Sequence, residues 1–260
     1  MRTRLQILVA LVLSFSAVTR AADIHVVSSG GFAAAYRTLA PEFEQTTGNH
    51  LITAWGPSMG NTTDAVPQRL ARNEPIDVVI MVGSALGKLV EEGKIIPDSR
   101  VDLAGSAIGI AIRSGSPKPD ITTLDSLRTA LLNAKSIAYS DSASGVYVST
   151  ELFRRLGIVD QVTGKSRMIP AEPVGSVVAR GEAQIGFQQI SELKPIQGIE
   201  LVGPLPEDVQ KITIFSAGIV TGSKDPDAAK SLITFLSSPA ATQAITSSGM
   251  EPIKRPALRE

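Results

Sequence analysis

The chain has 260 residues, of which 43% are hydrophobic, 19% charged and 4% aromatic, with 25 basic and 25 acidic side chains and no cysteine. The apolar content is too high for a disordered chain, and the balanced charge with few aromatic side chains argues against a nucleic-acid-binding protein. Without cysteine there is no disulfide, thiolate metal site, cysteine nucleophile or lipid-modified N-terminal cysteine, and the length suits one large domain or two moderate lobes.

The first residues, 1–21, have the pattern of a secretory signal peptide. Arg2 and Arg4 give a positive start, residues 5–18 are mostly apolar, and Ala21 is a small residue at the cleavage point, with Ala22 as the alternative. The apolar run is shorter than the ~20 residues that a membrane-spanning helix needs. We therefore expect export to a bacterial periplasm and a mature chain that is not inserted in the membrane.

The first half of the mature chain alternates predicted strands and helices. The predicted strands are 24–27, 51–55 and 77–82, and the predicted helices are 32–43, a segment ending near 72, and 86–92. The run 77–82 is continuously apolar, as in a parallel sheet covered on both faces. This order predicts an open, doubly wound α/β sheet.

The same order restarts after residue 105. The predicted strands are 106–113, 136–139, 167–169, 184–189 and 211–220, and the predicted helices are 124–133, 146–156, 176–180, 228–237 and 240–248. Two such units predict two lobes joined by two crossings of the chain. We expect the first lobe to contain 22–105 and 221–260, and the second lobe to contain 106–220.

Four loops between a predicted strand and a predicted helix are rich in Ser, Thr or Gly. In open α/β sheets ligands bind beyond the carboxyl ends of the strands, and helix N-termini present free N–H groups to anions. Each loop alone is explained by ordinary helix capping, but four together predict an anion-binding cleft between the lobes. The predicted binding residues, with two amides from another strand end, are Ser28, Ser29, Gly30, Gly31, Ser58, Met59, Asn61, Thr62, Thr63, Ser142, Ser144, Gly145, Val174, Gly175, Gln188 and Gln189.

The familiar catalytic and cofactor motifs are absent. The two histidines, His25 and His50, lie in no metal-ligand spacing, and there is no Gly-x-Ser-x-Gly elbow or nucleotide-binding glycine motif. We therefore predict no metal site. Tyr147 has two interpretations, a packing aromatic and a ligand contact. Several carboxylates near strand ends are expected to act mostly as caps or rim charges: Asp64, Asp77, Asp141, Glu172 and Glu192.

Six short segments resemble the periplasmic molybdate-binding proteins of ATP-driven importers, in the order seen in that family. They are FEQTTG, PIDVVI, SASGVY, ELFRRLG, GEAQIGF and FSAGIV. The resemblance covers residues 23–253. It implies the two-lobe clamshell of type II periplasmic binding proteins, in which each lobe is a doubly wound, mixed or parallel sheet flanked by helices, and it implies a monomer.

The oxyanion-binding positions of that family are altered here. Gly31 stands close to a position where the family has a serine, the second loop is bulkier with Met59 and Asn61, and Gln188 or Gln189 replaces a tyrosine. A tetrahedral dianion needs a small, tight cage. These changes predict a larger ligand with spaced acceptor groups, such as a di- or tricarboxylate.

Within this family the sequence is similar to a divergent branch, the periplasmic aconitate isomerases of pseudomonads. That resemblance implies interconversion of trans- and cis-aconitate by an allylic proton shift, which needs fixed donors and a base but no metal or organic cofactor. The candidates for the base are Asp64, Asp141, Tyr147 and His25. The alternative is a binding protein that delivers molybdate or a di- or tricarboxylate to an importer permease.

Overall fold

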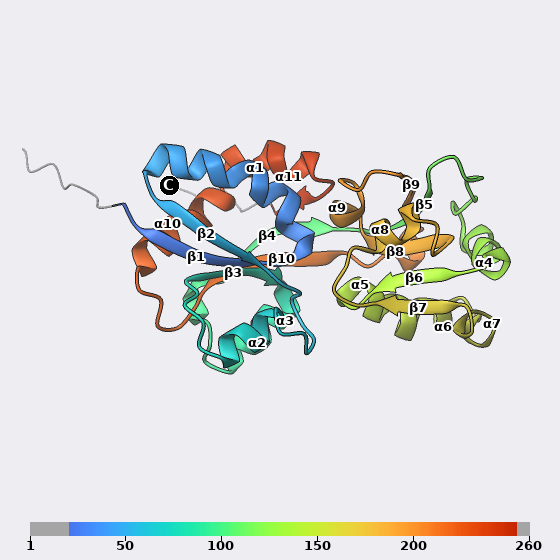
Figure 1. The fold of residues 1–260 in the computed structure, drawn as a ribbon, viewed down its shortest axis with the longest axis horizontal. Helices are drawn as coiled ribbons and strands as arrows, with labels where there is room; N and C mark the ends of the chain where they lie inside the picture. The colour runs from blue at the N-terminus through green and yellow to red at the C-terminus, as the bar shows by residue number, and fades with distance from the viewer. Residues whose placement is uncertain (1–20, 254–260) are drawn as a thin grey trace, which may run out of the picture.

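The chain forms two separate mixed β-sheets, which lie end to end along the long axis of the computed structural model (Figure 1). The structure describes residues 21–253, so the predicted signal peptide lies, apart from Ala21, outside the described residues. The first sheet has the spatial order β11 (Glu251–Pro252), β4 (Val101–Ser106), β10 (Thr213–Ile219), β3 (Val78–Val82), β1 (Asp23–Ser28) and β2 (His50–Trp55). The second has the order β7 (Ser166–Ile169), β6 (Ile137–Ser140), β8 (Ile185–Gln189), β5 (Ile108–Arg113) and β9 (Ile199–Pro204).

Each sheet has a parallel half and an antiparallel half. In the first sheet β1 is parallel to β2 and β3, and β10 is antiparallel to β3 and β4. In the second sheet β6 is parallel to β7 and β8, and β5 is antiparallel to β8 and β9. The predicted fold class, two doubly wound units with mixed sheets, is confirmed.

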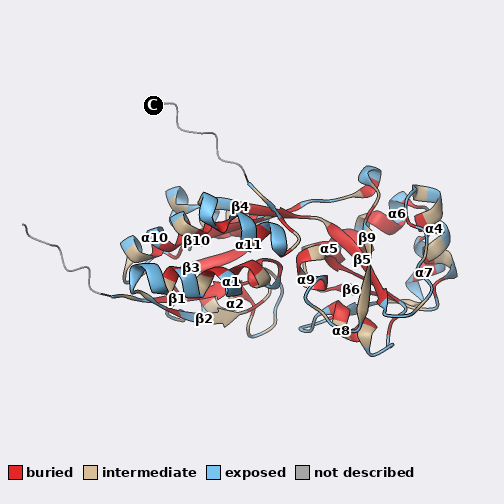
Figure 2. Cartoon of the chain, turned by 90° about the horizontal axis from the view of Figure 1, so that it is seen from above, coloured by how far each residue is buried: buried red, intermediate tan, exposed pale blue. Residues whose placement is uncertain are grey.

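Helices cover both faces of both sheets, so the central strands are among the most buried parts of each lobe (Figure 2). The helices of the first lobe are α1 (Gly30–Thr47), α2 (Val66–Ala71), α3 (Gly83–Glu91), α10 (Pro226–Leu236) and α11 (Thr242–Ser247). Those of the second lobe are α4 (Leu124–Asn133), α5 (Ala143–Tyr147), α6 (Phe153–Arg155), α7 (Val159–Thr163), α8 (Val174–Ala179) and α9 (Ile190–Leu193). A π-helical turn, η2 (Val148–Leu152), joins α5 to α6, and three short 3₁₀ turns complete the elements, η1 (Pro97–Ser99), η3 (Glu207–Val209) and η4 (Pro239–Ala241). No helix within residues 21–253 is both long and apolar enough to cross a membrane.

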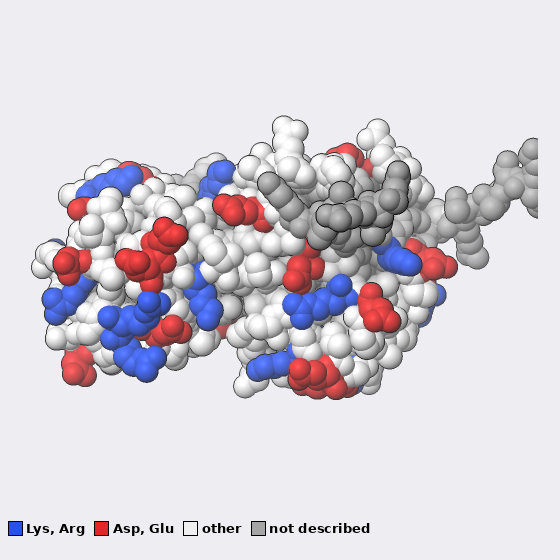
Figure 3. Space-filling view, turned by 180° about the vertical axis from the view of Figure 1, so that it is seen from behind, with Lys and Arg blue, Asp and Glu red and all other residues white. Residues whose placement is uncertain are grey.

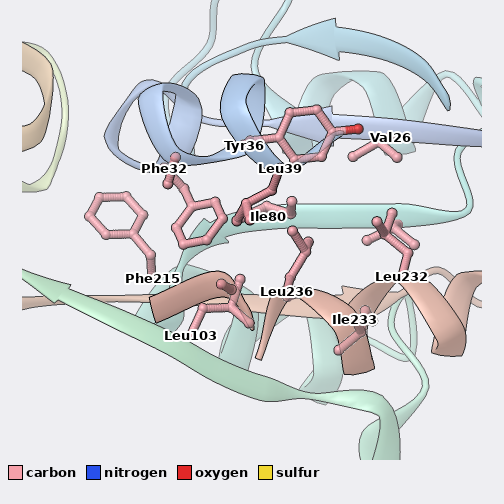
Figure 4. Packing of buried hydrophobic residues seen from close by; sticks show 14 of the residues in the cluster. Val26, Phe32, Tyr36, Leu39, Ile80, Leu103, Phe215, Leu232, Ile233 and Leu236 are labelled. Carbon is pink, nitrogen blue, oxygen red and sulfur yellow. The ribbon is translucent and has the colours of Figure 1, made fainter. Parts of the chain in front are cut away.

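The central strand β3 shows why the first sheet needs helices on two sides. All five residues of its sequence VVIMV are buried. Ile80 packs into the cluster that includes α1 and α10, whereas Val79 and Met81 pack into the cluster that includes α2 and α3. The core on the α1 side is drawn in Figure 4, where Phe32 and Ile80 lie close together. A continuous apolar run therefore indicates a strand covered on both faces.

Helix α1 follows directly from its sequence pattern. Phe32, Tyr36, Leu39 and Phe43 recur at helical spacing and are all buried in the first core. The helix ends at Gly48, which has the left-handed φ of 74° and donates its N–H to the Glu44 carbonyl. The glycine predicted to stop this helix is thus its C-cap.

The chain passes between the sheets twice, and only the first crossing lies where it was expected. The predicted strand 106–113 corresponds to β5; its first residue, Ser106, ends β4, a strand of the first sheet that was not predicted and that Ala107 alone separates from β5. The predicted strand 211–220 corresponds to β10, which pairs with β3 and β4 in the first sheet, so the second crossing lies within residues 205–212 and not near 220. An apolar strand pattern identifies a strand but does not say which sheet it joins.

Candidate functional site

A cavity of about 260 Å³ lies between the two lobes. It is formed by residues at or just beyond the carboxyl ends of β1, β2, β3, β6 and β8, where ligands bind in open α/β sheets. Its wall from the first lobe is Ser29, Gly30, Gly31, Trp55, Gly56, Pro57, Ser58, Asp64, Val82 and Phe215. Its wall from the second lobe is Ser140, Asp141, Ser142, Ala143, Ala171, Glu172, Pro173, Gln188, Gln189 and Glu192.

The cavity brings together part of the residue set predicted from the sequence. The predicted residues on its wall are Ser29, Gly30, Gly31, Ser58, Asp64, Asp141, Ser142, Gln188 and Gln189. Others lie close in the chain but off the wall: Ser28, Met59, Asn61, Thr62, Thr63, Ser144, Gly145, Val174 and Gly175. Glu172 and Glu192, which were expected to be caps or rim charges, also lie on the wall, whereas the remaining wall residues, such as Phe215, were not predicted.

Two predicted candidates for the base lie away from this cavity. His25 lines a different pocket, where the Asp77 carboxylate accepts its backbone N–H at 2.9 Å. Tyr147 belongs to the core of the second lobe and donates its hydroxyl to the Val209 carbonyl at 2.7 Å. Of its two interpretations, the packing aromatic fits the structure.

The start of α8 is occupied by the protein itself. The Val174 N–H donates to the Gln188 side-chain oxygen at 2.9 Å, and Gly175 packs closely against Ile196. The Val174 N–H is therefore not available to a ligand, and Gln188 lies on the cavity wall whereas Val174 and Gly175 do not. A polar group that caps a neighbouring helix has the same sequence signature as a ligand-binding group.

The start of α1 does face the cavity, and its side-chain donor is free. Ser29 is the N-cap residue, with extended backbone angles, yet its hydroxyl does not cap the helix. The Ser29 hydroxyl is buried and has no hydrogen-bond partner among the described residues. Together with the unpaired N–H groups of the first turn, it forms a donor set suited to an anion.

The two glycines at this helix start are required by close packing. A Cβ at Gly30 would overlap the carboxylate of Glu192, and a Cβ at Gly31 would overlap the ring of Phe215. Glu192 comes from α9 of the second lobe and Phe215 from β10 of the first, so both reach the same helix end. Gly30 therefore lets the two lobes approach each other at the cavity, and Gly31 lets α1 pack against β10 within the first lobe.

Hydroxyl groups and a strained loop form the wall of the second lobe. The Ser140 hydroxyl lies 2.9 Å from that of Ser142 and 3.0 Å from that of Ser144. The Asp141 carboxylate accepts the Ala171 N–H at 3.2 Å, and Ala171 has a φ of 58°. A left-handed alanine costs free energy and persists only where its surroundings hold it, here at the edge of the cavity.

Four carboxylates and no Lys, Arg or His side chain line the cavity within residues 21–253. Glu172 is neutralised, because its two oxygens accept from Arg180 at 3.1 Å each. Asp64, Asp141 and Glu192 have no such ion pair among the described residues. In the same part of the chain, no group of three or more His, Asp or Glu side chains has a geometry that would hold a metal ion.

The surroundings of Glu192 change its titration from that of a free carboxyl group. Burial among protein atoms raises the pKa of Glu192 to about 7, a hydrogen bond from the Gln188 amide opposes this rise, and the negative charge of Asp141 adds to it. The residue is not fully enclosed, since its carboxylate is on the cavity wall. The sequence analysis assigned it to caps or rim charges, and the structure places it between the lobes.

Gln188 and Gln189 end β8 and are both buried. The Gln189 side-chain N–H donates to the Thr213 hydroxyl at 2.8 Å, and its side-chain oxygen has no partner in the described part of the chain. Since Thr213 begins β10 of the first sheet, this bond connects the two lobes beside the cavity.

Comparison with known proteins agrees with this geometry. The sequence profile of the bacterial extracellular solute-binding proteins matches residues 24–251. The chain belongs to this family. Among its relatives, an aconitate isomerase of a Pseudomonas species is 54% identical over 88% of this chain and 87% of that protein. The molybdate-binding protein ModA of Azotobacter vinelandii is 26% identical over 88% of this chain and 90% of its own length.

Solved structures of solute-binding proteins share the fold. The periplasmic molybdate-binding protein of Azotobacter vinelandii superposes with a TM-score of 0.72 at 21% identity, covering 89% of this chain and all of that one. The predicted resemblance to molybdate-binding proteins and the type II clamshell fold are both confirmed. At this level of identity the structural match concerns the fold alone.

Proposed function

We propose that this solute-binding protein is an enzyme, an isomerase that interconverts trans- and cis-aconitate in the cavity between its lobes. The observation that carries the proposal is the 54% identity to an aconitate isomerase over 88% of the chain. The cavity is consistent with a small organic anion, because it combines free backbone and hydroxyl donors with a restricted volume.

Substrate binding would rest on donors fixed by the fold. Ser29 and the first-turn N–H groups of α1 suit one carboxylate, and Ser142, at the start of α5, suits another. The cavity volume of about 260 Å³ is several times the ~30 Å³ share of a water molecule in the liquid. A tricarboxylate would fill more of this space than a tetrahedral oxyanion.

The reaction requires a proton to leave one carbon of the substrate and a proton to be added at another. Removal of a methylene proton leaves an allylic anion whose charge spreads onto the attached carboxylate. Preorganised N–H and O–H donors around that carboxylate stabilise the charge as it develops. Protonation at the far end of the allyl unit moves the double bond. The net change is an isomerisation that consumes no oxidant, reductant or co-reactant.

An activity assay tests the proposal directly. The purified mature chain, residues 22–260, should convert trans-aconitate to cis-aconitate in buffer without added cofactor. In deuterated buffer the substrate methylene should exchange hydrogen for deuterium, because a proton shift through a protein group allows mixing with solvent. Tight binding of aconitate with neither conversion nor exchange would exclude the isomerase.

The family also suggests where and in what form the protein acts. Its relatives are described as extracellular solute-binding proteins. We propose that this chain acts in the periplasm as a monomer, after removal of residues 1–21. Detection of a periplasmic protein that lacks this segment, by mass spectrometry of fractionated cells, would support the proposal.

A second candidate function is delivery of an anion to an importer. It is favoured by the similarity to molybdate-binding proteins over most of the chain. Under this alternative the same cavity would bind molybdate or a di- or tricarboxylate and release it to a permease without chemical change.

A further inference from the structure

Proton transfer needs a base, and the cavity offers one that the sequence did not single out. We propose that Glu192 is the catalytic base, taking the methylene proton of aconitate and returning it at the other end of the allyl unit. The assignment rests on the proposed isomerase function. It starts from the position of the Glu192 carboxylate at the start of α1, between the lobes.

The carboxylate of Glu192 lies beside the helix start at which a substrate carboxylate would bind. Its oxygen contacts Gly30 so closely that a side chain there would overlap it, and Gly30 begins the helix whose free donors suit a carboxylate. A base beside a bound carboxylate is also beside the carbon that carries this carboxylate. In aconitate the acidic methylene is such a carbon, so the geometry places the base within reach of the proton that must move.

The short helix α9 holds this side chain firmly. The Ile190 N–H donates to the Ala107 carbonyl at 2.9 Å, and the Ser191 hydroxyl lies 3.2 Å from that of Ser106. Both bonds attach α9 to the crossing between β4 and β5. Helices α1 and α9 are also in direct contact, and α9 lies on the side of the second lobe that faces the first (Figure 1). Glu192 is therefore positioned by both lobes.

The other carboxylates of the cavity are less suited to the task. Glu172 forms an ion pair with Arg180, so both of its oxygens already accept hydrogen bonds from that side chain. Asp141 accepts the Ala171 N–H. Asp64 is on a loop whose backbone accepts from Arg69 at 2.9 Å and packs against Gly56, so its place is set by the first lobe alone.

The charged residues that share the cavity wall with Glu192 are all carboxylates. Asp64 lies on the loop after β2, Asp141 follows β6, and Glu172 precedes α8. The first turn of α1 carries no acidic residue, and the nearest charged residue along the α9 segment is Lys194. Burial and the Asp141 charge raise the pKa of Glu192 to about 7, near the pH at which a general base is most effective.

The proposed step balances without any further reactant. The ionised Glu192 carboxylate takes the proton as the methylene C–H bond breaks, and the electron pair enters the allyl system and the adjoining carboxylate. The protonated Glu192 then gives its proton to the far carbon, a new C–H bond forms, and the double bond shifts. The cavity holds the deprotonated arm of the substrate in one conformation, and this conformation decides whether the new double bond is cis or trans.

A structural role for Glu192 must be separated from a catalytic one. Glu192 stands three residues after Gln189, the N-cap residue of α9, a position from which a glutamate side chain can cap a helix start. Loss of a cap would lower stability but would not change the pH at which activity falls. The pH profile and the hydrogen exchange of bound substrate therefore decide between the two roles.

The experiment compares Glu192→Gln, Glu192→Asp and Asp64→Asn with wild type, using Glu42→Gln on the exposed face of α1 as a matched control. We expect Glu192→Gln to lower kcat by about 10²–10⁴-fold and to abolish methylene exchange, while cis-aconitate still raises its Tm. Glu192→Asp should keep part of the activity, so the assignment is testable even if the glutamine variant does not fold.

The wild-type kcat/KM should rise with pH and level off above about pH 7, because the base must be ionised. Glu192→Gln with activity within tenfold of wild type, or a wild-type profile flat through pH 7, would overturn the assignment, as would loss of exchange in Asp64→Asn but not in Glu192→Gln. If wild type itself shows neither conversion nor exchange, the isomerase proposal fails first, so the two failures are distinguishable.

Discussion

Ser29 occupies the N-cap position of α1 without acting as a cap. A serine at this position normally accepts a backbone N–H of the first turn. Here the hydroxyl is buried, and the described residues offer it no partner. Leaving a buried polar group unpaired costs about 1–3 kcal/mol in the free protein, and a ligand oxygen that accepts from this hydroxyl would remove the cost.

Replacement of Ser29 by alanine should therefore separate affinity from stability. A hydrogen bond to a charged group contributes about 1.5–3 kcal/mol, so Ser29→Ala should raise the KM for aconitate by about 10–150-fold. The Tm of the free protein should stay the same or rise, because an unpaired buried hydroxyl is lost. A suitable control is Ser237→Ala at the end of α10, far from the cavity. An unchanged KM with a lowered Tm would show that Ser29 is a structural residue.

At the scale of single elements, the loop between β6 and α5 shows that a glycine required for packing can look, in the sequence, like a glycine that contacts a ligand. Gly145 was predicted to contact the ligand, but a Cβ at this position would overlap the Ser140 carbonyl. The glycine lets α5 lie directly against the end of its own strand. The donors and acceptors that reach the cavity come from Ser140, Asp141 and Ser142 instead.

Two glycine substitutions in the second lobe should have opposite effects. Gly145→Ala should destabilise the protein by about 1–3 kcal/mol or more, because the added methyl meets backbone atoms that cannot move aside. Gly164→Ala should be neutral or stabilising by up to about 1 kcal/mol, since Gly164 has a φ of −68° and nothing within 4 Å of the new methyl. Denaturant unfolding measures both. Equal stability of the two variants would contradict the packing role assigned to Gly145.

Much of the fold could be predicted because each element carries its own pattern. The periodicity of α1, the continuous apolar run of β3 and the capping threonine of α4, Thr123, are all local signals. Pairing between strands is not local. Nothing in residues 211–220 says that β10 joins β3 and not β5, so the second lobe boundary was misplaced.

The site was predictable only in part, for the same reason. Helix starts at strand ends are visible in the sequence, and Ser29 and Ser142, at the starts of α1 and α5, line the cavity. Ser58 also lines it, but from the loop after β2, where its hydroxyl accepts the Val82 N–H at 2.9 Å. Glu192 was assigned to the rim because α9 has only four residues and its contact with Gly30 depends on how the lobes meet. The one available signal was its position three residues after Gln189, at the end of a predicted strand.

At the scale of the whole molecule, the 25 basic and 25 acidic side chains balance each other. We therefore expect selectivity for the ligand to come from the cavity and not from the net charge of the protein. Basic and acidic side chains are interspersed on the face shown in Figure 3. The cavity itself carries carboxylates and no cationic side chain within the described residues. The polyanion proposed as substrate would therefore be held there by dipoles and hydroxyls at short range, and the acidic wall would disfavour any anion whose oxygens do not match those donors.

A ligand that bridges the lobes should stabilise the entire protein, which allows its chemistry to be tested by melting temperature. A ligand at a hundred times its Kd adds about 2.7 kcal/mol, and for a chain of this size each kcal/mol raises Tm by about 2–4 °C. We expect cis- and trans-aconitate to raise Tm by about 5–11 °C and citrate by less. Molybdate, tungstate and sulfate should have no effect, because a tetrahedral oxyanion spans too little of the cavity to contact donors from both lobes. Stabilisation by molybdate alone would contradict this argument from ligand size and favour the transport alternative, since the Ser29 and Ser142 walls would then close on a compact dianion.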